Sequence, residues 1–185
     1  MLAFGVLFCA VVASLAWQRM QITWRYNGSA LTSASQNSAP QRPRHSPTLE
    51  ELEAKLPDVP YRILTRDPVL LARGQTVYRS SCAGCHGADL EGQPNWRRRD
   101  AEGNFPAPPH DETGHTWHHS DEVLFNIVKF GPGFYTPGYS GKMAAYEALL
   151  EDRDIKAVNS WIASTWPTDI LLAQRERTLT SEQLH

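Results

Sequence analysis

The chain has 185 residues, of which 41% are hydrophobic and 21% charged, and a formal net charge of −2. These proportions are typical of a globular protein and exclude a largely disordered chain. The lack of a basic excess argues against a nucleic-acid-binding protein, and three cysteines are too few for a disulfide-stapled scaffold. The length allows one domain of ordinary size with additional segments.

The N-terminal segment, residues 1–26, is predicted to be a membrane anchor or a signal segment. Residues 2–17 carry no charge and would form a helix of about 24 Å, slightly shorter than the bilayer's apolar layer of about 30 Å. No basic residue precedes this run and no small-residue cleavage site follows it, so we favour an uncleaved anchor. Arg19 and Arg25 lie on the side expected to be outside, against the positive-inside tendency.

A flexible linker with a short helix is predicted for residues 27–60. Its first part, residues 27–47, is rich in Ser, Ala, Gln, Asn and Pro, and such a segment cannot bury enough apolar surface to offset its ordering entropy. Thr48 and Glu51 then have the spacing of a capping box, which predicts a short helix that ends at Pro57.

Three further helices are predicted over residues 67–80, 121–130 and 152–166. The first begins with an Asp-Pro pair, which suits an N-cap and the first helical position. The other two have apolar residues at helical spacing and end at Gly or Pro. No stretch alternates like a strand. We therefore expect an all-α domain with long loops over residues 61–167, followed by a C-terminal tail at 168–185.

A Cys-x-x-Cys-His motif follows the first domain helix, formed by Cys82, Cys85 and His86. This spacing is typical of c-type haem attachment. Two thiols separated by two residues can reach the two vinyl groups of one porphyrin, while the adjacent imidazole reaches the iron from the same side. The motif therefore predicts one covalently bound haem c with His86 as an iron ligand.

Two other kinds of site could use a Cys-x-x-Cys pair. A structural zinc site would need a second pair of ligands, and the sequence contains no second cysteine pair. A thioredoxin-like redox pair would lie within a βαβ pattern, which is not visible here. Both alternatives are weaker than haem attachment.

Met143 is the candidate for the second iron ligand. The other methionines, Met1 and Met20, lie in or next to the apolar N-terminal segment, which leaves one usable thioether. A thioether opposite a histidine raises the reduction potential and leaves no open coordination position, which suits electron transfer. The alternative is that Met143 fills a gap in the core.

These motifs resemble class I monohaem cytochromes c over residues 67–167. The resemblance rests on Gly74 and Tyr78 ahead of the Cys-x-x-Cys-His motif, and on Met143, Tyr146 and Trp161 behind it. It implies a cytochrome c fold of about three to five helices around one covalent haem, in which the terminal helices cross at Gly74, Tyr78 and Trp161.

The resemblance also implies an electron carrier without catalysis of its own. Together with the apolar N-terminal segment, it predicts a domain tethered to the cell inner membrane, facing the periplasm, and shuttling single electrons between redox partner proteins. Two alternatives stay open. The domain could be the electron-accepting subunit of a larger oxidoreductase assembly, or it could bind gas or peroxide at an open iron site if Met143 is not a ligand.

A histidine-rich loop lies between the haem motif and Met143. Its imidazoles are His110, His115, His118 and His119. Such a cluster can bind copper or zinc, and one of these histidines could replace Met143 on the iron. The simplest interpretation is a solvated loop that covers the haem and bonds its propionates or the backbone.

Charged and aromatic residues surround the predicted ligands. Arg97, Arg98 and Arg99 would face water or, alternatively, pair with haem propionates or an acidic redox partner. Seven aromatic residues are expected to wall the haem or to fill the core. They are Trp96, Trp117, Phe125, Phe130, Phe134, Tyr135 and Tyr139.

Overall fold

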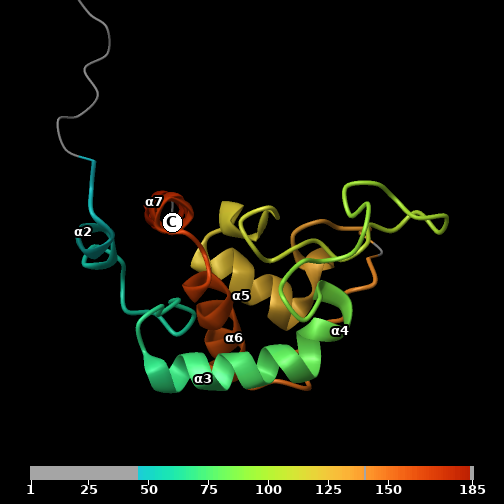
Figure 1. Ribbon diagram of the computed structural model, residues 1–185, viewed down its shortest axis with the longest axis horizontal. Helices are drawn as coiled ribbons and strands as arrows, with labels where there is room; N and C mark the ends of the chain where they lie inside the picture. Colours follow the sequence, from blue (N-terminus) through green and yellow to red (C-terminus); the bar gives the residue numbers. More distant parts are fainter. Residues whose placement is uncertain (1–45, 140, 184–185) are drawn as a thin grey trace, which may run out of the picture. The chain divides into compact units, whose positions relative to one another are not determined.

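The computed structural model describes residues 46–139 and 141–183, and every regular element in these two ranges is helical (Figure 1). The all-α prediction is therefore confirmed. The expected anchor at residues 1–26 lies outside the described residues. Within the described ranges, no helix is both long and apolar enough to cross a membrane.

Six α-helices make up the described part of the chain. They are α2 (Leu49–Glu53), α3 (Pro68–Val77), α4 (Ala83–His86), α5 (Asp121–Phe130), α6 (Asp152–Ser164) and α7 (Thr168–Glu182). A π-helical turn, Tyr78–Cys82, joins α3 to α4, and short 3-10 turns occupy Thr116–His118 and Pro132–Phe134. The first predicted domain helix therefore continues, through this turn, into the haem motif.

The predicted N-caps are present. At α2, the Thr48 amide donates to the Glu51 carboxylate at 2.8 Å, and the Glu51 amide donates back to the Thr48 hydroxyl at 3.2 Å. Asp67 accepts hydrogen bonds of 3.0 Å from the backbone amides of Val69 and Leu70 at the start of α3. Each cap satisfies backbone donors that have no partner within the helix.

Helices α3 and α6 cross at Gly74. A Cβ atom at this position would overlap the carbonyl oxygen of Ala157, so only glycine permits the observed approach. Next to this contact, the rings of Tyr78 and Trp161 pack with their centroids 4.8 Å apart. Figure 1 shows α6 running across α3. The crossing implied by the resemblance is thus observed.

One buried apolar cluster holds the helices together, and α3, α5, α6 and α7 all contribute to it. Its buried members are Ile63, Val77, Tyr78, Leu90, Leu124, Val158, Ile162, Ala163, Trp166 and Leu171. The long loop between α4 and α5 supplies Leu90, and so the loop that follows the haem motif is anchored to the helical core.

The C-terminal segment differs from its prediction. Residues 168–182, expected to belong to a tail, form α7, which packs against α2. Residues 47–60, which we assigned to the linker, lie in the same compact unit as the rest of the described chain. The sequence did not predict this packing, because the buried side of α7 carries Gln174, Arg175 and Thr178 and therefore lacks the apolar stripe that marks a packed helix.

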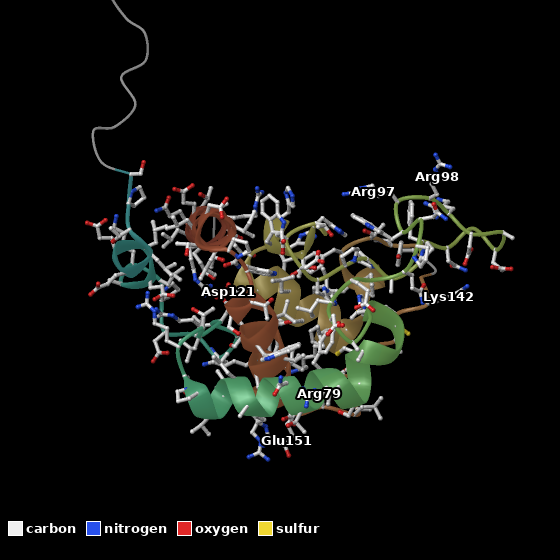
Figure 2. The ribbon with its side chains drawn as sticks, viewed as in Figure 1. Arg79, Arg97, Arg98, Asp121, Lys142 and Glu151 are labelled. Atoms are coloured by element: carbon white, nitrogen blue, oxygen red, sulfur yellow. The ribbon has the colours of Figure 1, made fainter. Side chains whose placement is uncertain are left out.

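A polar network attaches α7 to α5. Oδ1 of Asp121 accepts hydrogen bonds from Gln174 at 2.8 Å, from Thr178 at 3.1 Å and from Arg175 at 3.3 Å. Oδ2 of Asp121 accepts a hydrogen bond from the Ile63 amide at 2.8 Å. Figure 2 shows Asp121 in the interior, among the helices. Because these four groups all donate to the carboxylate and one of them is the Arg175 guanidinium, the buried charge is compensated.

Candidate haem site

The two thiols of the Cys-x-x-Cys-His motif lie on consecutive helical turns. Cys82 ends the π-helical turn after α3 and is partly buried, while Cys85 lies on α4 and is exposed; neither is in a disulfide. Burial is the main reason that the pKa of Cys82 rises to about 11, and the nearby Cys85 raises it further. Because neither thiol is in a disulfide, both are available for a bond to a cofactor.

His86, the last residue of α4, is buried and is held in an orientation that suits a metal ligand. Its Nδ1 lies 2.8 Å from the carbonyl oxygen of Pro108. Because a carbonyl oxygen can only accept, Nδ1 carries the hydrogen and Nε2 keeps its lone pair free. Burial also lowers the pKa of His86, which favours the neutral imidazole. Two free thiols and this imidazole fit the attachment and ligation of haem c.

Two glycines allow the loop around Pro108 to approach His86. Gly92 has φ +68°, and a Cβ atom there would overlap the Pro109 amide nitrogen. A Cβ atom on Gly114 would overlap the Pro109 carbonyl oxygen. The Gly92 amide also donates to the His86 carbonyl at 2.8 Å. Close backbone packing thus presents the Pro108 carbonyl to the imidazole.

Two tyrosines fasten the motif to the rest of the domain. The Tyr78 hydroxyl donates to the Gly87 carbonyl at 2.8 Å, and the Tyr146 hydroxyl donates to the Ser81 carbonyl at 2.7 Å. Tyr146 follows Met143 by three residues, so the segment after Met143 lies against the motif. Met143 itself is partly buried, and its ligation of the iron stays a prediction.

The histidines of the loop pack on different partners, and His115 and His119 meet edge-on with ring centroids 5.5 Å apart. His110 stacks on His86, His115 on Trp96 and His118 on Trp117, with ring centroids 3.9, 5.5 and 3.7 Å apart. Among residues 46–139 and 141–183, no group of three or more His, Cys, Asp or Glu side chains could hold a metal ion. The hypothesis of a copper or zinc site is therefore not supported.

The expected aromatic wall divides into separate groups. Phe125 is buried and packs against Tyr61, with ring centroids 6.2 Å apart. Phe130, Phe134 and Tyr135 are exposed and pack on one another, with neighbouring centroids 5.0 Å apart.

The basic run lies on the long loop between α4 and α5 and is exposed. The guanidinium of Arg97 stacks over Trp96 at 4.0 Å, and that of Arg99 stacks over Phe105 at 4.4 Å. Figure 2 shows Arg97 and Arg98 at the outer edge of this loop. Lys142 bonds Asp100 at 2.6 Å, which ties the same loop to the residue before Met143.

Sequence reasoning missed the groups that surround the imidazole. Pro108, Gly92 and Gly114 act through backbone atoms or through the absence of a side chain. The Pro-Ala-Pro-Pro run and the two glycines were the available signals, but the spacing alone does not say which carbonyl reaches the ring.

Comparisons with known proteins agree with this geometry. A family model described as cytochrome c matches residues 71–166, about half of the chain. The chain is 31% identical over 91 residues to the Cbb3-type cytochrome c oxidase subunit CcoP of Rubrivivax gelatinosus; the matched region is 49% of this chain and 27% of that protein. No solved structure matches the chain. The helical fold, the Cys-x-x-Cys-His motif and the family match together show that the chain belongs to the class I c-type cytochromes, which bind haem c and transfer electrons.

Proposed function

We propose that the protein is an electron carrier with one haem c, bound covalently through Cys82 and Cys85 and ligated by His86 and Met143. The observation that carries this proposal is the 2.8 Å hydrogen bond from His86 Nδ1 to the Pro108 carbonyl. His86 lies on the same short helix as Cys85. This hydrogen bond keeps the imidazole in the tautomer that can bind iron. The haem supplies a reversible one-electron couple when bound.

The protein's own residues hold and shield this cofactor. The two thiols would form thioether bonds, which prevent loss of the haem outside the cytoplasm. Position supports Met143 as the second residue that would bind the iron, since the Tyr146 hydroxyl donates to the Ser81 carbonyl beside Cys82, and Lys142 donates to Asp100. The first contact brings the chain after Met143 to the motif, and the second ties the chain before Met143 to the long loop that follows the motif. A His/Met pair would leave no open coordination position on the iron, which would favour electron transfer over ligand binding.

The test of haem attachment is expression of the full chain together with a haem-attachment system. We expect one haem per chain in a pyridine haemochrome assay and a matching increase in mass. The double variant Cys82→Ser, Cys85→Ser should carry no covalent haem. The variant His118→Ala should keep it, because His118 is an exposed residue of the loop between α4 and α5. An unmodified chain without covalent haem would contradict the proposal.

The test of Met143 is spectroscopic. The oxidised protein should show a methionine-to-iron charge-transfer band that Met143→Ala abolishes, together with a lower reduction potential. Carbon monoxide should bind the reduced variant but not the reduced unmodified protein. Rapid binding of carbon monoxide by the unmodified protein would instead favour a gas or peroxide site at an open iron.

We further propose that residues 1–26 anchor the domain to the inner membrane and that the domain faces the periplasm. The support is the uncharged run at residues 2–17 and the need for haem attachment outside the cytoplasm. The unmodified chain should fractionate with membranes, and a variant with a cleavable signal sequence in place of residues 1–26 should be released as a soluble haem protein. Soluble unmodified protein would contradict the anchor.

A second candidate function is that of an electron-transferring subunit of a membrane oxidase. The similarity to subunit CcoP favours it, although the match spans 27% of that protein. A tagged chain purified from its native membranes in mild detergent should then bring an oxidase with it in fixed proportion. Purification as a single haem protein, with oxygen uptake unchanged in cells that lack the gene, would favour the free carrier.

A further inference from the structure

His110 has an environment that the proposed electron carrier does not yet explain. Its ring stacks face to face on the imidazole of His86, with centroids 3.9 Å apart and an angle of 23° between the planes. The ring therefore lies beside the predicted iron ligand instead of opposite it. This position does not suit a ligand that replaces Met143, but it does suit a group that acts on His86.

Hydrogen bonds fix His110 from three directions. Its Nδ1 forms a hydrogen bond of 2.8 Å with the Thr116 hydroxyl, and Thr116 is buried. Its amide donates to the Leu90 carbonyl at 2.8 Å, and its carbonyl accepts from the Trp166 indole at 2.8 Å. Since Leu90 and Trp166 belong to the buried core, the ring is held by the helices as well as by its own loop.

The stacked ring covers one face of the His86 imidazole and keeps water away from that face. Its flat shape also restricts rotation of the His86 ring, which the Pro108 carbonyl holds at one edge only.

We propose that His110 is a positioning residue for the iron ligand: stacked on His86 and held by Thr116, it sets the plane of the imidazole and raises the reduction potential of the haem. Groups around a ligating histidine control its orientation and the polarity of the site. Because ferric haem carries one more positive charge than ferrous haem, excluding water disfavours the ferric form and raises the potential. The inference rests on the proposed ligation by His86.

The experiment compares four variants of the holoprotein, expressed as the full chain with haem attached. His110→Ala removes the ring, His110→Phe keeps a flat ring of similar size, and Thr116→Val removes the hydrogen bond while keeping the shape. His118→Ala is the matched control, because His118 is exposed in the same loop and stacks on Trp117 instead of His86. The readouts are the reduction potential and the electron paramagnetic resonance spectrum of the ferric protein, which reports ligand-plane orientation.

For His110→Ala we expect the ferrous-to-ferric ratio at a fixed ambient potential to fall about tenfold, which is about 59 mV for one electron. Its resonance spectrum should broaden as the ligand plane becomes heterogeneous. Thr116→Val should shift both readouts in the same direction by less. His110→Phe keeps the stacked ring but loses the bond to Thr116, so it should resemble Thr116→Val, and His118→Ala should change neither readout.

Each outcome decides a different claim. Unchanged potential and spectrum in Thr116→Val and His110→Ala, with haem attached, would overturn the role of His110 and leave the electron carrier intact. If His110→Ala fails to retain haem, Thr116→Val and His110→Phe decide the question. An unmodified chain without covalent haem would overturn the proposed function and this inference together.

Discussion

At the scale of single residues, the backbone carbonyl of Pro108 determines how His86 can bind iron. The 2.8 Å bond to Nδ1 assigns the tautomer and leaves Nε2 free. No side chain takes part, so the bond depends on how closely the loop approaches. Gly114 permits that approach, because its missing Cβ leaves room for the Pro109 carbonyl.

The first prediction therefore concerns Gly114. In Gly114→Ala, the new methyl group overlaps the Pro109 carbonyl, so we expect the free energy of unfolding to fall by about 1–3 kcal/mol, as for other overpacked sites. Urea denaturation of the holoprotein measures this change. Gly133→Ala is the control, because this glycine lies outside the haem motif and a Cβ atom there meets only the Tyr139 carbonyl oxygen, at 3.6 Å. Equal stability of the two variants would refute the proposed contact.

The residues of the site differ in how visible they were in the sequence. Cys82, Cys85 and His86 are adjacent along the chain, so their spacing alone carried the prediction. The stacking of His110 on His86 joins residues 24 positions apart through a folded loop. Loop conformation of this kind has no local pattern, and so the sequence suggested a metal site or a solvated loop instead.

At the scale of secondary structure, the crossing of α3 and α6 holds the two ends of the cytochrome domain together. Gly74 provides the close approach, and Tyr78 packs on Trp161 beside it. The caps of α2 and α3 were visible in the sequence because capping acts within a few residues. The crossing was inferred from the family resemblance, which Gly74 and Trp161 carried.

A second prediction tests the crossing. Gly74→Ala places a methyl group, fixed to the backbone of α3, against the backbone carbonyl of Ala157 in α6, and neither group can move without shifting a helix. We expect a loss of about 3 kcal/mol, seen as a lower melting temperature by circular dichroism. Thr76→Ala, on the exposed side of the same helix, should leave the temperature nearly unchanged. A Gly74→Ala protein as stable as that control would be inconsistent with this contact.

A third prediction concerns α7. Arg175 is fully buried and donates to Asp121 at 3.3 Å and to the Ile63 carbonyl at 3.3 Å. Arg175→Ala leaves the Asp121 charge buried without this partner, and so we expect a loss of about 3–5 kcal/mol. Chemical denaturation gives the value, with the exposed neighbour Glu176→Ala as the control. A loss of less than about 1 kcal/mol would show that α7 behaves as the tail expected from the sequence.

At the scale of the whole molecule, the histidine-rich loop links stability to pH. His119 lies at the start of the segment that joins this loop to α5, and its carbonyl accepts from Gln174 at 3.2 Å. Burial is the main cause of the lowered pKa of His119, and the neighbouring His115, His118 and Arg177 lower it further. The folded protein therefore binds a proton at His119 less readily than the unfolded chain does.

The fourth prediction follows from the sign of this shift. The contribution of His119 is fully present above its unfolded pKa of about 6.5 and is lost as the pH falls below it. We expect the free energy of unfolding of the holoprotein to decrease from pH 7.5 to pH 5.5, and to decrease less in His119→Gln. Above pH 7 the two proteins should show parallel pH dependence. Equal slopes below pH 6.5 would contradict the shift.

The sequence by itself determined the helical class of this protein, the starts of its capped helices and the residues expected to attach haem. These features depend on neighbours a few positions apart, which a linear pattern records. Only the tertiary structure decided that Pro108 orients His86, that His110 stacks on it, and that α7 is bound to the domain through Asp121. Each of these joins residues distant along the chain through backbone carbonyls or buried polar groups, whose partners are selected when the chain folds.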